Sequence, residues 1–217
     1  ALYADVLLWA EKGWIDYLMP QLYWDLEHKL ASYLTLVEWW NNNACGRHLF
    51  VGQDVAVTMK KPDIGDSNEN SQLRHKINLT REAENIQGNC WWPGYSITDN
   101  TGGVADSLTI DLQATVAVPP AYSWISQKRP ASVKGLSHKD GKLTWDAPQI
   151  KKSPDDAVKF VVYRFEPGDE IDLENSEAIE GVTWRNEFTA EDPGIYVVTA
   201  LSRVNQESEP SKTIKVR

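Results

Sequence analysis

Three apolar segments of this 217-residue chain each end in side chains that could bind a sugar. These side chains are Gln21, Tyr23 and Trp24 at the end of the first segment, Gln53 and Asp54 at the end of the second, and Trp92 at the end of the third. Amide groups hydrogen-bond sugar hydroxyls, and aromatic rings stack on the apolar faces of pyranose rings. If the segments are neighbouring strands, the side chains form a carbohydrate subsite. The alternative interpretation is that they are packed, hydrogen-bonded residues of the fold itself.

The acidic residues of these segments do not make a catalytic pair. Hydrolysis of a glycosidic bond normally needs two carboxyl groups about 5–10 Å apart. Asp54 is the only acid directly at the end of a segment, Asp25 and Glu27 follow another, and Asp16 begins one. We therefore expect a structural or hydrogen-bonding role for Asp54, and no catalytic residue is assigned.

Other kinds of chemistry find little support in the sequence. The histidines, His28, His48, His75 and His138, lack the spacing of a zinc site, and there is no GxSxG nucleophile motif. Cys45 and Cys90 form no CxxC pair, and we interpret them as small, buried residues whose redox state the sequence leaves open. We expect neither a metal nor a cofactor.

The composition narrows the class of protein further. The chain carries 22 basic and 31 acidic residues, a net charge of −9, which argues against nucleic acid as a partner. Its 41% hydrophobic content is that of a globular protein, and no apolar run reaches the ~18–20 residues that cross a membrane. Tryptophan is concentrated in the first part of the chain, at positions 9, 14, 24, 39, 40, 91, 92 and 124.

Helices alternate with strands in the first part. The apolar pattern predicts helices near 2–9, 30–40, 71–87 and 104–112, strands near 15–24, 48–55 and 90–95, and a polar loop at 60–70. Alternation within the first strand turns Leu18 and Leu22 toward the helices and Gln21 and Tyr23 toward the other face. This order predicts a parallel sheet, either open and doubly wound or part of a (β/α)8 barrel. A doubly wound sheet that binds nucleotides should carry a glycine-rich turn after a strand, and its absence favours the barrel. Three strands are less than half of a complete barrel.

Several motifs in order carry a family resemblance. They are Gly13-Trp14-Ile15-Asp16-Tyr17, Pro20-Gln21-Leu22-Tyr23-Trp24, Val37-Glu38-Trp39-Trp40, Phe50-Val51-Gly52-Gln53, Cys90-Trp91-Trp92-Pro93-Gly94-Tyr95 and Gly103-Val104-Ala105-Asp106. Residues 1–125 resemble the late part of the glycosyl-hydrolase-10-like family of bacterial lipoproteins, in the form found in Bacteroidetes. The resemblance implies a TIM barrel whose last three strands are present, with catalytic acids on earlier strands. It also implies a lipid-anchored protein of the cell envelope.

Short strands without helices make up the second part. They are expected at 133–136, 142–145, 158–165, 183–188, 194–202 and 213–216, separated by turn residues, as in a β-sandwich. The segments Leu143-Thr144-Trp145-Asp146-Ala147-Pro148 and Tyr196-Val197-Val198-Thr199 make this part similar to a fibronectin type III domain. The resemblance implies that Trp145 is the core tryptophan and that Tyr196 is the tyrosine-corner residue. A spacer or packing role is expected.

The sequence thus predicts an α/β part followed by an all-β part, divided as 1–128 and 129–217. We expect the C-terminal fragment of a cell-envelope glycoside hydrolase that acts on a polysaccharide or on peptidoglycan glycan. On this interpretation the fragment contributes substrate-binding residues and is inactive alone. The alternative is a non-catalytic carbohydrate-binding or envelope interaction protein that acts as a spacer. Because a truncated barrel leaves an edge and a face uncovered, we expect the chain to self-associate or to cover that face with its sandwich.

Overall fold

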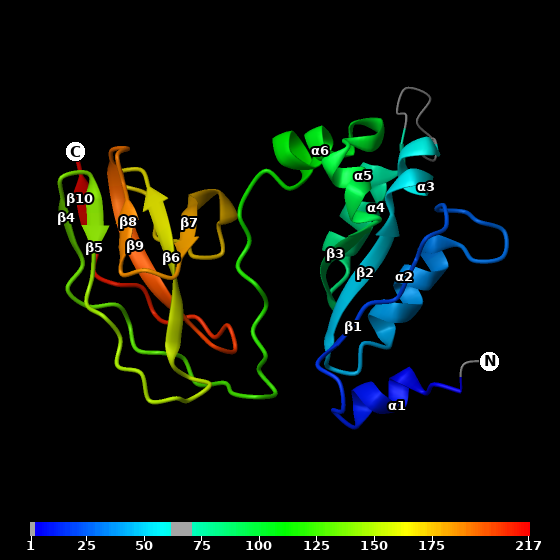
Figure 1. The fold of residues 1–217 in the computed structure, drawn as a ribbon, viewed down its shortest axis with the longest axis horizontal. Coiled ribbons are helices and arrows are strands. Elements are labelled where there is room, and N and C mark those ends of the chain that lie inside the picture. Colours follow the sequence, from blue (N-terminus) through cyan, green and yellow to red (C-terminus); the bar gives the residue numbers. More distant parts are fainter. Residues whose placement is uncertain (1–2, 62–70) are drawn as a thin grey trace. The chain divides into compact units, whose positions relative to one another are not determined.

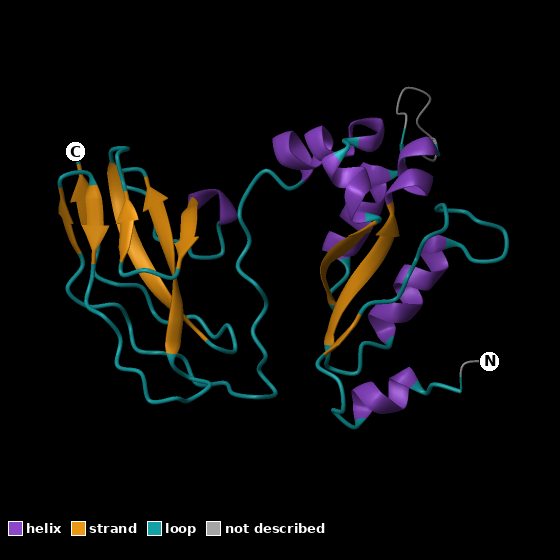
Figure 2. Cartoon of the chain, in the orientation of Figure 1, coloured by secondary structure: helices purple, strands orange, loops and turns teal. Residues whose placement is uncertain are grey.

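The computed structural model describes residues 3–61 and 71–217. They form two compact units, Ala1–Ala114 and Thr115–Arg217 (Figure 1). The first contains helices and strands, and the second contains strands with little helix (Figure 2). Each unit has its own core of buried apolar side chains.

Strands alternate with helices in the first unit, as the sequence predicts. The elements are α1 (Val6–Glu11), β1 (Tyr17–Leu18), α2 (Tyr33–Asn42), β2 (His48–Asp54), α3 (Val55–Lys60), α4 (Leu73–Glu82), β3 (Ile86–Trp92), α5 (Gly94–Thr98), η1 (Thr101–Gly103), α6 (Val104–Ser107) and η2 (Leu108–Leu112). The strands pair in parallel in the order β1-β2-β3. The described residues form no closed barrel, because this sheet has three strands and two free edges.

The first strand is shorter than expected. Beyond its two residues, pairing with β2 continues only as an isolated bridge between Gln21 and Gly52. Pro20 interrupts the ladder because it has no N–H to donate. Its carbonyl still accepts from the Gly52 N–H at 2.9 Å, and the Leu22 N–H donates to the Gly52 carbonyl at 3.0 Å.

Other boundaries also differ from the prediction. Helix α4 ends at Glu82, and β3 begins at Ile86, four residues before the predicted strand. Helices α3 and α5 were not predicted. Helix α3 begins where β2 ends because the Asp54 carboxylate accepts from the Val57 N–H at 2.7 Å and caps it. Most of the predicted polar loop, residues 62–70, lies outside the described residues.

One face of the parallel sheet is covered by helices. Leu18, Leu49 and Val51 point from the strands into a core that α1 and α2 share. Ser32 caps α2 through the Thr35 N–H. A second cluster joins α3, α4, α6 and η2 around Val55. These two clusters form the apolar core of the first unit.

We call the opposite face of the sheet the open face. Strand alternation assigns to it Tyr17, Met19, Gln21, Tyr23, His48, Phe50, Gly52, Asp54, Gly88, Cys90 and Trp92, of which His48 is buried beside the Phe50 ring. Tyr17 and Met19 are 51% and 43% exposed, whereas Leu18 between them is buried. The first strand is therefore buried on one face only, although an unbroken apolar run of this kind is typical of a strand that is buried on both.

The second unit is a sandwich of two antiparallel sheets. One has the order β10-β9-β6-β7 and the other β4-β5-β8. The elements are β4 (Ser137–Lys139), β5 (Lys142–Thr144), β6 (Ala157–Phe165), η3 (Ser176–Ala178), β7 (Ile179–Thr183), β8 (Glu187–Thr189), β9 (Gly194–Ser202) and β10 (Ile214–Val216). Trp145 packs edge-on against Phe160 in the core between the sheets, with ring centroids 5.2 Å apart. The Tyr196 hydroxyl donates to the Asp192 carbonyl at 2.9 Å.

Two strand predictions for this unit were wrong. Residues 133–136 form no strand, and the predicted strand at 183–188 is divided between β7 and β8 by a turn. The two halves belong to different sheets, so the chain crosses the sandwich at this turn. Strands β6 and β9 are buried on both faces, because Val118, Ile171 and Leu173 cover the side away from β5.

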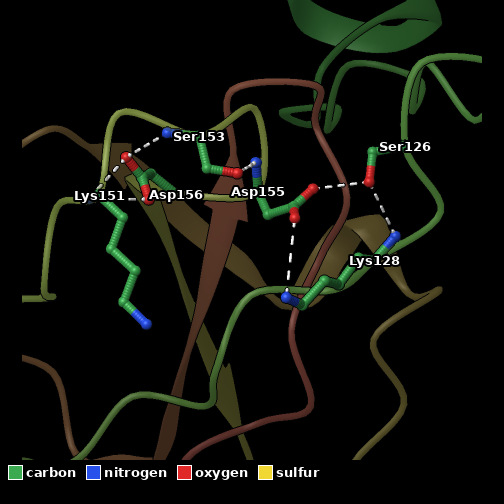
Figure 3. Close-up of polar contacts among 6 residues, drawn as sticks. All are labelled: Ser126, Lys128, Lys151, Ser153, Asp155 and Asp156. Carbon is green, nitrogen blue, oxygen red and sulfur yellow. Dashed lines mark hydrogen bonds and ion pairs between the residues drawn. The ribbon is translucent and has the colours of Figure 1, made fainter.

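Residues 115–128 belong to the second unit, and Figure 3 shows the contacts of Ser126 and Lys128 there. The Ser126 hydroxyl donates to Asp155 at 2.6 Å, and the Lys128 ammonium lies 3.8 Å from the same carboxylate. The neighbouring Asp156 carboxylate accepts from the Lys151 and Ser153 N–H groups at 3.1 Å. Asp156 thus fixes the loop before β6, and Asp155 holds the segment that enters the sandwich.

Asp156→Asn is expected to flatten the acid dependence of the second unit's stability. Burial opposes the charge of Asp156, but backbone N–H donors outweigh it and hold the pKa of the carboxyl below its usual range. The folded state therefore binds this proton less tightly than the unfolded state, so the stabilisation is present above about pH 4 and is lost in more acid solution. Urea titrations from pH 5 to about pH 2, followed by NMR signals of β6, measure it.

Asp140→Asn serves as the matched control, because the Asp140 side chain is 86% exposed and its nearest cation is Lys139 at 4.0 Å. An Asp156→Asn profile that falls in acid as steeply as the wild-type profile would show that the carboxylate does not fix this loop.

Candidate functional site

The carboxyl end of the parallel sheet brings several predicted site residues together. Gln21 lies beside Gly52 across the bridge, and Asp54 lies beside Trp92 in the register of β2 and β3. The carboxyl ends of parallel strands are where binding sites form in α/β folds. This edge is therefore the candidate site.

Tyr23 lies across Gly52 on the open face. A Cβ atom at Gly52 would come within 3.5 Å of the Tyr23 ring and 3.0 Å of the Pro20 carbonyl oxygen, so glycine allows this close approach. Burial, and then the negative charge that Cys90 and Asp54 can carry, raise the pKa of Tyr23. Its hydroxyl stays protonated near neutral pH and can donate a hydrogen bond.

Two tryptophans present their rings to solvent at this edge. Trp24 is 40% exposed and Trp92 is 57% exposed, although large aromatic rings gain by burial. Trp91, the residue before Trp92 in β3, instead packs against the cluster around Val55. Trp24 and Trp92 therefore offer apolar surface that a flat ligand ring could cover.

The acids near this edge are engaged in structural contacts. Asp54 caps α3, and the Asp25 carboxylate pairs with the Lys61 ammonium at 3.1 Å. Asp54 thus has the hydrogen-bonding role that its position suggested. Both of these carboxylates thus have partners within the fold.

Gln53 lies on the other face of the sheet. Its side chain is fully buried, and its amide nitrogen donates to the Tyr33 hydroxyl at 2.5 Å and to Asn89 Oδ1 at 2.8 Å. The Asn89 amide in turn donates to the Thr80 hydroxyl at 2.9 Å. This network joins β2 and β3 to α2 and α4. The structure therefore separates Gln53 from the other predicted substrate-binding residues, Gln21, Tyr23, Trp24, Asp54 and Trp92.

Lys76 is a residue of this region that sequence reasoning missed. Its side chain is fully buried behind the carboxyl edge of the sheet, where it donates to the Trp24 carbonyl at 2.8 Å. One signal could have found it. Leu73, Lys76, Ile77 and Thr80 are the buried stripe of α4, so the lysine occupies an apolar position of the helical pattern.

Metal binding and membrane insertion find no support in the part of the chain that the structure describes. No group of three or more His, Cys, Asp or Glu side chains there could hold a metal ion. Across residues 3–61 and 71–217, no helix is both long and apolar enough to pass through a bilayer. Cys45 and Cys90 are free thiols.

Gln53→Leu is expected to lower the free energy of unfolding of the first unit by about 2 kcal/mol, because the Tyr33 hydroxyl and Asn89 Oδ1 lose the N–H donor that Gln53 supplies. Gln21→Ala is the matched control. Gln21 is exposed, so its loss should change stability by less than about 0.5 kcal/mol. Urea unfolding measures both variants. If Gln53→Leu left stability unchanged but abolished binding of a sugar, Gln53 would be a ligand rather than a structural residue.

The chain is similar in sequence to proteins named glycosyl hydrolases. No family model matches it. It is 30% identical to the glycosyl hydrolase YngK of Bacillus subtilis over 223 residues, which cover 97% of the chain and 43% of YngK. The glycosyl hydrolases DigH of Escherichia coli and of Shigella flexneri are 45% identical to it over 38 residues, 18% of the chain and 9% of each relative. The chain thus spans less than half of the length of these relatives, and its sequence is glycosyl-hydrolase-like.

Proposed function

We propose that the open face binds a glycan at its carboxyl edge, as part of a glycoside hydrolase whose catalytic pair lies outside this chain. The observation that carries the proposal is that Gln21, Tyr23 and Asp54 meet at the carboxyl edge beside exposed Trp92, with exposed Trp24 next to Tyr23 in the chain. Aromatic platforms beside hydrogen-bonding groups suit pyranose rings. The similarity to YngK along nearly the whole chain supports this choice of ligand.

The first unit, Ala1–Ala114, would contain the last three strands of a TIM barrel, which the division drawn from the sequence placed in residues 1–128. Its parallel sheet has helices on one face and exposed side chains on the other, which is the arrangement of a barrel sector. YngK is more than twice as long as the aligned segment. Further strands would complete the barrel and bring the catalytic acids, so the chain alone is expected to be inactive.

The second unit would be a fibronectin type III-like domain that acts as a spacer or packing module. Its buried Trp145 and the bond from the Tyr196 hydroxyl to the Asp192 carbonyl support this assignment. From the resemblance to Bacteroidetes lipoproteins, we further propose a lipid-anchored protein of the cell envelope. Its substrate would be a polysaccharide or the glycan of peptidoglycan.

The second candidate function is non-catalytic carbohydrate binding or a spacer role in the envelope. The engagement of Asp54 in a helix cap and of Asp25 in an ion pair favours it, because each of these acids already has a structural partner. Hydrolysis by a longer gene product, lost when an acid outside this segment is replaced, would exclude this alternative. Hydrolysis by the present chain alone would contradict the proposal that the pair lies elsewhere.

Self-association is expected from the uncovered sheet. Strands β1 and β3 are its free edges, and Tyr17, Met19 and Trp92 expose apolar surface on its open face. Sedimentation velocity over a range of concentrations should show dimers or larger species, unless the sandwich covers this face. A monodisperse monomer whose two units tumble independently would contradict this expectation.

Trp92→Ala and Trp24→Ala should each weaken glycan binding about tenfold, a loss of about 1.4 kcal/mol, because each removes a stacking surface. Isothermal titration of the chain with soluble peptidoglycan glycan strands measures the affinity. Trp14→Ala is the matched control, because Trp14 is 67% exposed but precedes β1 at the opposite end of the sheet. Equal losses in all three variants, or none in any, would show that the carboxyl edge is not the binding site.

A further inference from the structure

We propose that Lys76 is a positioning residue for the carboxyl edge, where its buried ammonium holds the segment that carries Tyr23 and Trp24 against helix α3. The inference rests on the proposed function, because the segment and α3 border the proposed glycan site. The hydrogen bonds of Lys76 go to the Trp24 carbonyl and the Thr58 hydroxyl rather than to an open-face side chain. It would act through the backbone that those side chains depend on.

Three elements supply the partners of the Lys76 ammonium. It donates to the Trp24 carbonyl at 2.8 Å, beyond β1, and to the Thr58 hydroxyl at 3.1 Å, in α3. It also lies 4.6 Å from the centre of the Tyr33 ring, in α2. A buried ammonium is costly unless it is hydrogen-bonded or paired. The partners therefore account for a lysine in a fully buried position.

Gln72 makes a parallel connection one helical turn earlier. The Leu26 N–H donates to the Gln72 side-chain carbonyl at 3.0 Å, and the Gln72 N–H donates to the Thr58 carbonyl at 3.2 Å. Helix α4 and the residue before it thus bind both the segment after β1 and α3. The Trp24 backbone is held at the point where the chain leaves the sheet, which sets where the Trp24 ring can lie.

The charges around Lys76 favour its protonated form, and its burial opposes it. Asp25, which pairs with Lys61, and Asp54 attract the ammonium. Tyr33 is neutral, because burial raises its pKa well above the usual range. On its own helix, Arg74 pairs with Asp111, and His75 is the adjacent residue. Burial outweighs the two carboxylates and lowers the pKa of Lys76 to about 8.

Loss of this proton should affect binding and stability in opposite directions. Above about pH 8 the neutral amine makes weaker hydrogen bonds, so the segment is held less firmly and glycan affinity falls. Between about pH 8 and the ordinary lysine pKa near 10.4, the unfolded state binds more protons than the folded state, so the contribution of Lys76 to stability rises with pH. A merely structural lysine would not produce this divergence.

The binding experiment compares Lys76→Met, which removes the charge, with Lys76→Arg, which keeps it at every pH used. Titration with soluble peptidoglycan glycan strands from pH 7 to about pH 9.5 gives the affinities, with Cys90→Ser in every protein to remove the open-face thiol from the profile.

We expect wild-type affinity to fall several-fold with pH, and Lys76→Met to bind about tenfold more weakly with a flat profile. Lys76→Arg should also be flat but tighter than Lys76→Met. Lys60→Met, at an exposed position of α3, should follow the wild type. Equal binding by Lys76→Met and wild type, or a flat wild-type profile, would overturn the inference.

Hydrogen exchange tests the inference without a glycan. Amides of residues 20–30 should exchange several-fold faster in Lys76→Met than in wild type or Lys60→Met, compared at one pH. If wild type binds no glycan, the proposed function fails, and the exchange result still decides the role of Lys76. Should Lys76→Met not fold, Thr58→Val, which removes one acceptor, should give a smaller increase. Unchanged exchange in the variant that folds would overturn the inference.

Discussion

The first unit depends on one constraint, which is that β2 has a face covered by helices and a face that is not. Leu49, Val51 and Gln53 point toward the helices and are fully buried. Gly52 and Asp54 alternate with them and point to the open face. A shift of one residue would exchange the two sets, so the helical core fixes which side chains can meet a ligand.

The site is supported from behind by buried polar groups. Gln53 joins β2 to α2 and β3, and Lys76 joins the segment after β1 to α3. Polar groups in a protein interior stabilise a particular arrangement when their hydrogen bonds are satisfied, and are costly when they are not. The exposed side chains of the carboxyl edge, Trp24 and Trp92, therefore project from a backbone whose position is set by contacts that a ligand never touches.

Much of the architecture could be predicted from the sequence because apolar spacing reports burial directly. The parallel α/β order and the orientation of Leu18 and Leu22 followed from it. The face of Gln53 did not, because a buried amide partnered by Tyr33 and a ligand-binding amide look alike in a sequence. The division of 183–188 between two strands also escaped prediction, since the turn there carries neither Gly nor Pro.

The central claim is that a glycan binds the carboxyl edge of the open face. Chemical-shift mapping of the assigned protein during titration with soluble peptidoglycan glycan strands tests it most directly. We expect the indole N–H signals of Trp24 and Trp92 and the side-chain amide of Gln21 to shift, while the Gln53 amide and the Trp14 indole stay in place. Shifts confined to the second unit, or no shifts at millimolar glycan, would contradict the claim.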